Sequence, residues 1–69
     1  MNPTIRVNGA QEPLQAATVY ELLRSKNINL DNKGIAVALN GRVLARNAWA
    51  DTVLCPGDAV EIVKAFAGG

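Results

Sequence analysis

The last two residues of the sequence, Gly68 and Gly69, have the chemistry of a handle on which other enzymes can act. Glycine has no Cβ atom, so a Gly-Gly end is slender enough to carry its carboxylate into a narrow active-site channel. A carboxylate is unreactive at neutral pH, but it becomes an acyl donor once an enzyme converts it to an acyl-adenylate. The opposing interpretation is a frayed end of small residues, which is common in domains. We expect Gly69 to be a free terminus, and the rest of the sequence must distinguish the two.

Few other residues could perform chemistry. The sequence has no histidine and one cysteine, Cys55, so neither a zinc site nor a Cys-x-x-Cys pair can form. Because no histidine or second thiol is available to activate Cys55, we interpret it as a small apolar residue before a turn. Neither a phosphate-binding Gly-rich loop nor a cluster of carboxylates occurs. The chain is therefore expected to bind no cofactor and no metal itself, and to be no enzyme.

Length and composition favour one small module, residues 1–69, that other proteins bind or modify. A chain of this size buries roughly 60% of its unfolded surface, which leaves little room for a deep cavity. Seven Lys and Arg against six Asp and Glu give a net charge of +1, with no basic run, so no nucleic-acid or membrane surface is expected. A single cysteine excludes an internal disulfide, and no leader segment or long apolar run occurs, which favours a cytoplasmic location.

The first strands should form a hairpin. Residues 4–7 alternate polar and apolar side chains, as a half-buried strand does. Asn8-Gly9 is a strong signal for a tight turn, and the return strand is expected near residues 12–15. Because Pro13 has no N–H, that strand should lie at an edge of the sheet.

A helix is expected after the hairpin. Thr18 and Glu21 have the spacing of a capping box, in which each side chain satisfies a backbone N–H at the helix start. The helix should end between residues 27 and 29. Its apolar stripe comprises Val19, Leu22 and Leu23.

The second half predicts further strands. Residues 35–39 form a continuous apolar run that suits a strand buried in the sheet, and Asn40-Gly41 turns the chain into a short strand over residues 42–44. Trp49 lies in a short irregular or one-turn helical segment and is expected to anchor the core. Pro56-Gly57-Asp58 is a turn signal, with Asp58 organising the turn through its side chain.

The last strand, expected over residues 59–65, leads directly into the Gly-Gly end through a flexible tail, residues 66–69. Alternation places Val60 and Ile62 towards the helix and the residues between them on the opposite face. Four residues next to the handle are expected to form an apolar docking surface for partner proteins: Val63, Ala65, Phe66 and Ala67.

The predicted order of elements defines a fold. A single main helix packed on one face of a mixed sheet of four to five strands is an α+β arrangement. A hairpin, then a helix, then further strands in so short a chain is the order of the ubiquitin-like β-grasp fold.

The second half also carries a set of motifs that one protein family combines. They are Val37-Ala38-Leu39-Asn40-Gly41-x-Val43, then Arg46 and Trp49, then Leu54-x-x-Gly57-Asp58-x-Val60-Glu61-Ile62, and finally Ala65-Phe66-Ala67-Gly68-Gly69. Together they resemble the ThiS family of sulfur carriers in thiamin biosynthesis. The resemblance covers almost the whole chain and is most specific over residues 37–69. Two departures, Ala45 where the family more often has proline and Cys55-Pro56, fall in turns.

The resemblance implies a function for the handle. An E1-like adenylyltransferase would use ATP and magnesium to adenylate the Gly69 carboxylate, with Gly68 as a slim spacer. A persulfide sulfur from a donor such as a cysteine desulfurase would then displace AMP and leave a thiocarboxylate. Thiazole synthase would accept this sulfur while it builds the thiazole ring.

Three alternatives remain open from the sequence. A sulfur carrier for molybdopterin synthesis is the nearest, although that family usually has a longer chain and a proline-rich approach to the tail. A ubiquitin-like protein modifier would form isopeptide bonds to lysines instead of accepting sulfur. An interaction domain with an inert tail would support no ATP–pyrophosphate exchange with an E1-like enzyme.

Overall fold

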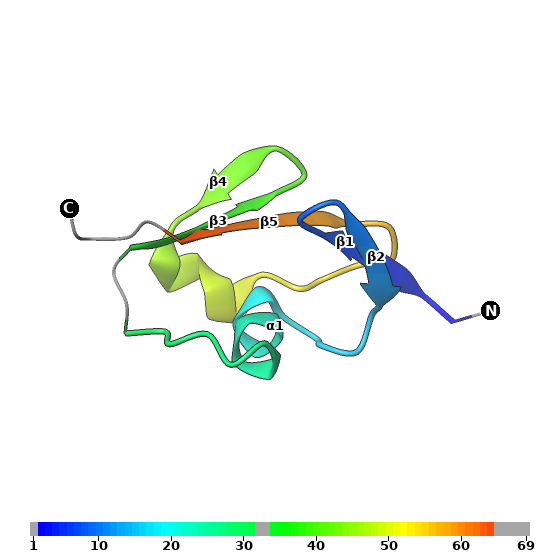
Figure 1. Ribbon diagram of the computed structural model, residues 1–69, viewed down its shortest axis with the longest axis horizontal. Helices are drawn as coiled ribbons and strands as arrows, with labels where there is room; N and C mark the ends of the chain where they lie inside the picture. The colour runs from blue at the N-terminus through cyan, green and yellow to red at the C-terminus, as the bar shows by residue number, and fades with distance from the viewer. Residues whose placement is uncertain (1, 32–33, 65–69) are drawn as a thin grey trace.

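The computed structural model describes residues 2–31 and 34–64, which form a single sheet with a helix on one face (Figure 1). In chain order the elements are β1 (Thr4–Val7), β2 (Ala10–Pro13), α1 (Val19–Ser25), β3 (Ile35–Leu39), β4 (Arg42–Leu44), the 3₁₀ helix η1 (Arg46–Asp51) and β5 (Ala59–Lys64). The strand order is β2-β1-β5-β3-β4, with β1 and β5 parallel and the other pairs antiparallel. This is the mixed five-stranded sheet of the predicted β-grasp fold, with the Pro13 strand at an edge as expected.

Both predicted Asn-Gly turns are present, and they set the register of the hairpins. Asn8 and Gly9 have φ values of 52° and 84°, and Asn40 and Gly41 have 51° and 86°, the positive pair that a type I′ turn requires. A two-residue turn pairs the residues on either side of it, so Val7 lies opposite Ala10. The return strand therefore begins at Ala10, two residues earlier than the sequence suggested.

Helix α1 begins and ends near the predicted positions. The Thr18 hydroxyl accepts the Glu21 N–H at 3.2 Å, as a capping residue does. The Glu21 carboxylate accepts the N–H of Ala17 at 2.8 Å, one residue before the expected partner. Lys26 ends the helix, and Asn27 follows with φ of 58°, a left-handed conformation that asparagine tolerates.

The core lies between the sheet and α1, with η1 alongside the helix. Trp49 in η1 is 3% exposed and anchors this core as predicted, with the Arg46 guanidinium carbon 4.6 Å from the centre of its ring. No helix of residues 2–31 and 34–64 covers the opposite face of the sheet, so Ala36, the second residue of the apolar run 35–39, is exposed. The buried apolar side chains are Ile5, Val7, Val19, Leu22, Leu23, Ile28, Ile35, Val37, Trp49, Leu54 and Val60.

Asn40 fixes the start of β5. Its Oδ1 accepts the Ala59 N–H at 2.9 Å, its Nδ2 donates to Asp58 Oδ1 at 3.0 Å, and its own N–H donates to the Ala59 carbonyl at 2.8 Å. The other carboxylate oxygen of Asp58 accepts the Cys55 N–H at 2.8 Å, so Asp58 organises its turn as predicted. One turn side chain thus joins the β3–β4 hairpin to the strand that leads to the handle.

We expect Asn40→Gly to lower the free energy of unfolding by about 1–2 kcal/mol, because glycine keeps the turn but loses both side-chain hydrogen bonds. Asn40→Ala should cost about 1 kcal/mol more, since alanine tolerates the left-handed conformation poorly. Urea unfolding measures both changes. Asn2→Gly is a control at an exposed position and should change little; equal effects at positions 2 and 40 would contradict the role given to Asn40.

Candidate functional site

The predicted handle follows directly from β5. Gly68, Gly69 and the predicted tail over residues 66–69 lie outside the described residues, as do the docking residues Ala65, Phe66 and Ala67. Lys64 is the last described residue and closes β5. The described part of the site is therefore the strand that presents the handle and the surfaces on either side of it.

Strand β5 is held on both sides where it begins. Its register with β1 pairs Ala59 with Arg6 and Val60 with Val7, while β3 pairs with it from Val60 as far as Lys64. Hydrogen bonds to two neighbouring strands hold β5 rigidly, and the predicted handle follows this strand in the sequence. The sheet thus fixes the position of Lys64, the last described residue before the predicted tail.

The open face of the sheet carries an apolar patch next to the end of β5. Val63, which the alternation predicted to face outwards, is 59% exposed, and Val43 on β4 is 80% exposed. Val63 lies opposite Ala36 in the β3–β5 pairing, and Val43 lies opposite Ala38 in the β3–β4 pairing, so all four side chains share one face. We call Ala36, Ala38, Val43 and Val63 the open-face patch.

Three of these four residues were not predicted as part of a site. The signal was nevertheless in the sequence: the two-residue turn at Asn40-Gly41 dictates that Ala38 pairs with Val43. What the sequence did not define was the pairing of β3 with β5, which brings Ala36 next to Val63. That pairing depends on contacts between distant segments.

Charged residues border the open-face patch. Glu61 of β5 lies opposite Ala38 of β3, and Arg6 of β1 lies opposite Ala59 of β5. Both charged residues are therefore on the face of the sheet that α1 does not cover. Both side chains are exposed. An apolar centre with a charged rim is the usual composition of a protein-binding surface.

Cys55 lies at the wrong end of β5 for a role beside the handle. Its turn precedes the strand, and the six residues of β5 separate it by about 20 Å from Lys64, the last described residue. Cys55 precedes the turn, as predicted, and its thiol is exposed. Cys55 and Lys64 therefore lie at opposite ends of β5.

If the chain accepts sulfur, as its resemblance to a sulfur-carrier family implies, we expect Cys55→Ser to load it at the same rate as the unchanged protein, within about twofold. Serine has nearly the same size, and the backbone N–H that bonds Asp58 remains. Intact-mass measurement of both proteins during loading tests this. A complete loss of loading in the serine variant, with an unchanged folded fraction, would make Cys55 a sulfur-handling group.

The described residues contain neither a metal site nor a helix that could span a membrane. Between residues 2 and 64, without 32 and 33, no group of three or more Cys, Asp or Glu side chains is placed to hold a metal ion. Within the same residues, the helices are all too short or too polar to cross a membrane. The handle and the open-face patch remain the features with a functional interpretation.

Comparison with known proteins gives a consistent result. The sequence matches the ThiS family over residues 3–69. It is 36% identical over 63 residues to the sulfur carrier protein ThiS of Thermus thermophilus, an alignment that covers 91% of this chain and 95% of that protein. A crystal structure of the thiamine biosynthesis protein ThiS from Geobacter metallireducens has a TM-score of 0.77 at 35% identity, covering 96% of this chain and 99% of that one. A solution structure of a thiamine biosynthesis protein from the same organism has a TM-score of 0.76 at 36% identity, covering 100% and 88%.

Proposed function

Because the chain belongs to the ThiS family of sulfur carrier proteins, we propose that it carries sulfur for thiazole formation as a thiocarboxylate on Gly69. The observation that carries this proposal is the extent of the family match, which continues through Gly68 to Gly69. A carrier is a co-substrate and not a catalyst. This role accords with a sequence that has no histidine and a single cysteine.

The proposed activation needs one group from this chain, the terminal carboxylate. A carboxylate oxygen attacks the α-phosphate of ATP in the active site of an E1-like adenylyltransferase, and pyrophosphate leaves with magnesium. A persulfide sulfur from a donor such as a cysteine desulfurase then attacks the acyl carbon, and AMP leaves. A thiol reduces the resulting acyl disulfide and releases the thiocarboxylate. The carrier itself binds neither ATP nor magnesium in this scheme.

The thiocarboxylate is suited to donation. Sulfur is softer and more nucleophilic than the carboxylate oxygen that it replaces, so thiazole synthase can take it into the growing ring. Gly68 serves as the spacer that lets the reactive end pass through a narrow channel, because it has no side chain. The partners supply the acids, bases and phosphate contacts that this small chain does not provide.

The open-face patch is the proposed binding surface for these partners. Its apolar centre lies at the end of β5 from which the handle departs, and Val63 and Val43 are both largely exposed. Ala65, Phe66 and Ala67 would extend the contact along the tail towards Gly68. Docking on this face would present the handle to the partner while the opposite face of the sheet keeps its helix.

ATP–pyrophosphate exchange with a purified E1-like adenylyltransferase tests the first step. We expect exchange that depends on the carrier and disappears when Gly69 is deleted. A carrier without Gly69 that supports the same exchange would contradict the proposal, and a covalent adduct to lysines of other proteins would indicate a modifier. Supplying the loaded carrier to thiazole synthase and, separately, to the large subunit of molybdopterin synthase identifies the pathway, since sulfur should be consumed by the first.

A further inference from the structure

The second half of β5 has an open edge, although the strand lies in the middle of the sheet. Strand β1 pairs with it only at Ala59 and Val60 and then turns away at Asn8. The Asn8 side chain takes the place of one more paired residue, because its Oδ1 accepts the Ile62 N–H at 2.7 Å. On the other side, β3 continues to pair as far as Lys64.

The direction of the backbone groups shows what this edge offers. Backbone groups of successive residues in a strand point to opposite neighbours, and the Val60 carbonyl and the Ile62 N–H both point to the β1 side. The Ile62 carbonyl and the N–H and carbonyl of Lys64 therefore point the same way. Within residues 2–31 and 34–64, no backbone group pairs with them on that side. Such an edge is a template for an added strand.

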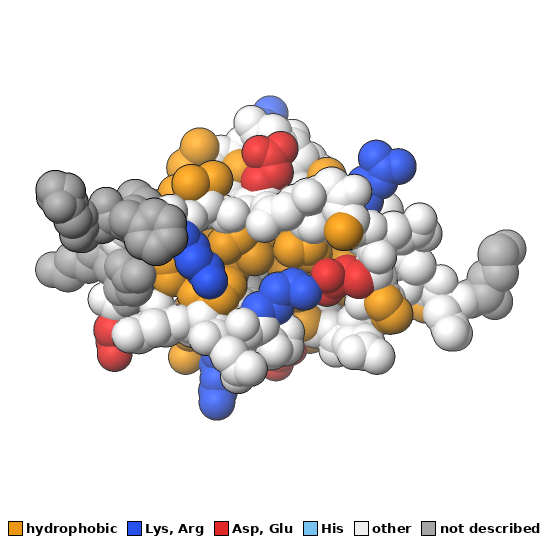
Figure 2. Space-filling model, viewed as in Figure 1, with side chains coloured by type: hydrophobic (Ala, Val, Ile, Leu, Met, Phe, Trp, Pro, Cys, Tyr) orange, Lys and Arg blue, Asp and Glu red, His pale blue; other side chains and the backbone are white. Residues whose placement is uncertain are grey.

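An apolar groove lies beside this edge. It has a volume of about 560 Å³, and it is lined by Val7 and Asn8 of the hairpin, Glu12 of β2, Lys26 and Ile28 after the helix, and Ile62 and Lys64 of β5. Its apolar floor is formed by Val7, Ile28 and Ile62. Figure 2 shows hydrophobic side chains gathered in the middle of this face, with basic and acidic side chains around them.

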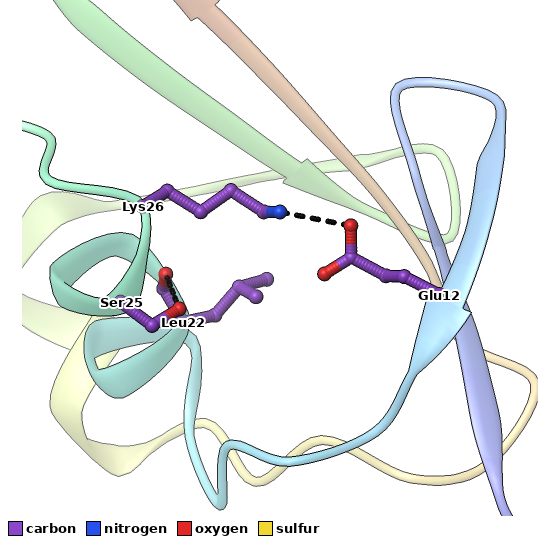
Figure 3. A network of polar contacts seen from close by, with 4 residues as sticks. All are labelled: Glu12, Leu22, Ser25 and Lys26. Carbon is purple, nitrogen blue, oxygen red and sulfur yellow. Dashed lines mark hydrogen bonds and ion pairs between the residues drawn. The ribbon is translucent and has the colours of Figure 1, made fainter.

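The two lysines that line the groove differ in their ion pairing. Lys26 Nζ lies 2.8 Å from Glu12 Oε2, so this ion pair ties the helix end to β2 across the groove (Figure 3). Lys64 is exposed and forms no ion pair within the part of the chain that the structure describes. The Lys64 ammonium is therefore the basic group of the groove that can donate to a carboxylate of a partner.

We propose that the β5 edge at Ile62 and Lys64 binds an extended, acidic segment of a partner protein as an added strand. The inference concerns a second docking surface, apart from the open-face patch, and it does not depend on sulfur transfer. Ile62 and Lys64 share one face, so an added strand places two of its own side chains beside them, two residues apart. An aliphatic side chain fits beside Ile62 over the apolar floor, and a carboxylate fits beside Lys64.

The predicted ligand is thus a short motif, acid-x-aliphatic in one strand direction and aliphatic-x-acid in the other. Main-chain hydrogen bonds supply affinity in this mode of recognition, and the alternate side chains supply specificity. The peptide acetyl-Glu-Thr-Val-Thr-Glu-amide satisfies the motif in both directions. Two matched peptides separate the contributions: one with lysine in place of both glutamates, and one with N-methyl groups on the valine and on the threonine after it, which removes the backbone N–H that would donate to the Ile62 carbonyl in either strand direction.

Titration of the ¹⁵N-labelled carrier with these peptides tests the inference. With the glutamate peptide we expect shifts at Ile62, Lys64 and Asn8 and slower hydrogen exchange of the Lys64 amide. The lysine and N-methylated peptides should bind at least about fivefold more weakly. Lys64→Glu should weaken the glutamate peptide by a similar factor, whereas Arg42→Glu, the same charge change on the far edge strand, should not.

Three outcomes would overturn the inference. Unchanged signals along β5 with the glutamate peptide would show that the edge accepts no strand. Shifts confined to Val43 and Val63 would place the binding on the open-face patch. Changes at Ile62 and Lys64 that follow dilution of the carrier alone would show that a second copy of the chain is the occupant.

Discussion

Adding one residue after Gly69 should lower the rate of ATP–pyrophosphate exchange by at least about 100-fold, because a misplacement of about 1 Å can already cost that much. An extra residue moves the terminal carboxylate by about 3.3 Å along an extended chain, away from the α-phosphate that it must attack. Binding to the adenylyltransferase should change less than the exchange rate, since the open-face patch is untouched. Exchange at saturating carrier concentration measures the loss.

Replacing the spacer gives a graded companion to this result. Gly68→Ala adds one methyl group and Gly68→Val adds a branched side chain, so the exchange rate should fall in that order if the channel is narrow. Neither substitution replaces a core residue that the structure describes, so we expect the thermal midpoint to stay the same. Equal exchange rates for the valine variant, the extended chain and the unchanged protein would contradict the role of the Gly-Gly end.

Val63→Asp should weaken the complex with the adenylyltransferase by about 30- to 1,000-fold, which corresponds to roughly 2–4 kcal/mol. In the free carrier this side chain is 59% exposed, so aspartate leaves the fold intact. In the complex the same carboxylate would be buried against an apolar surface without a partner, and the cost of removing its hydration falls on binding. Calorimetric titration measures the dissociation constant.

Val53→Asp is the matched control for this prediction. Val53 is 64% exposed, close to the value for Val63, but it lies in the segment that bridges to Thr18 beside the helix. The same substitution there should leave the dissociation constant within about twofold of the unchanged protein. Equal weakening by both variants would attribute the effect to added charge and not to the open-face patch.

Local sequence signals predicted much of the fold. The Asn-Gly dipeptides gave both hairpins, because two successive positive φ values select few other residues. Thr18 gave the helix start through its hydroxyl, and alternation along residues 59–64 gave the outward direction of Val63. Each of these signals depends only on residues that are close in the sequence, so each structure could be predicted from the local sequence.

Long-range pairing was beyond these signals. The Asn8 side chain bonds a residue 54 positions later, and the Asn40 side chain bonds Ala59, although each asparagine was interpreted as a turn residue alone. The open edge of β5 arises from its register with β1, because β1 ends at Val7, opposite Val60, whereas β5 continues to Lys64. Such features depend on how distant segments meet, and no local spacing encodes them.

The candidate site likewise has one part that the local sequence predicted and one part that depends on long-range strand pairing. The chemistry of Gly68 and Gly69 could be inferred from composition, because no other group in the chain competes with the terminal carboxylate. The open-face patch needed the sheet, since Ala36 and Val43 reach Val63 through strand pairing. The sequence thus predicted Gly69 as the reactive group, and the fold defined the open-face patch on the described strands.

Fragmentation of the intact, sulfur-loaded carrier in a mass spectrometer tests the central claim most directly. If sulfur is carried as a thiocarboxylate on Gly69, the mass gain equals the exchange of one oxygen for one sulfur. The gain is then confined to C-terminal fragments that contain Gly69. A gain of a whole sulfur atom on fragments that contain Cys55 would mean a persulfide on the thiol. That result would contradict the assignment of the carrier function to the Gly69 carboxylate.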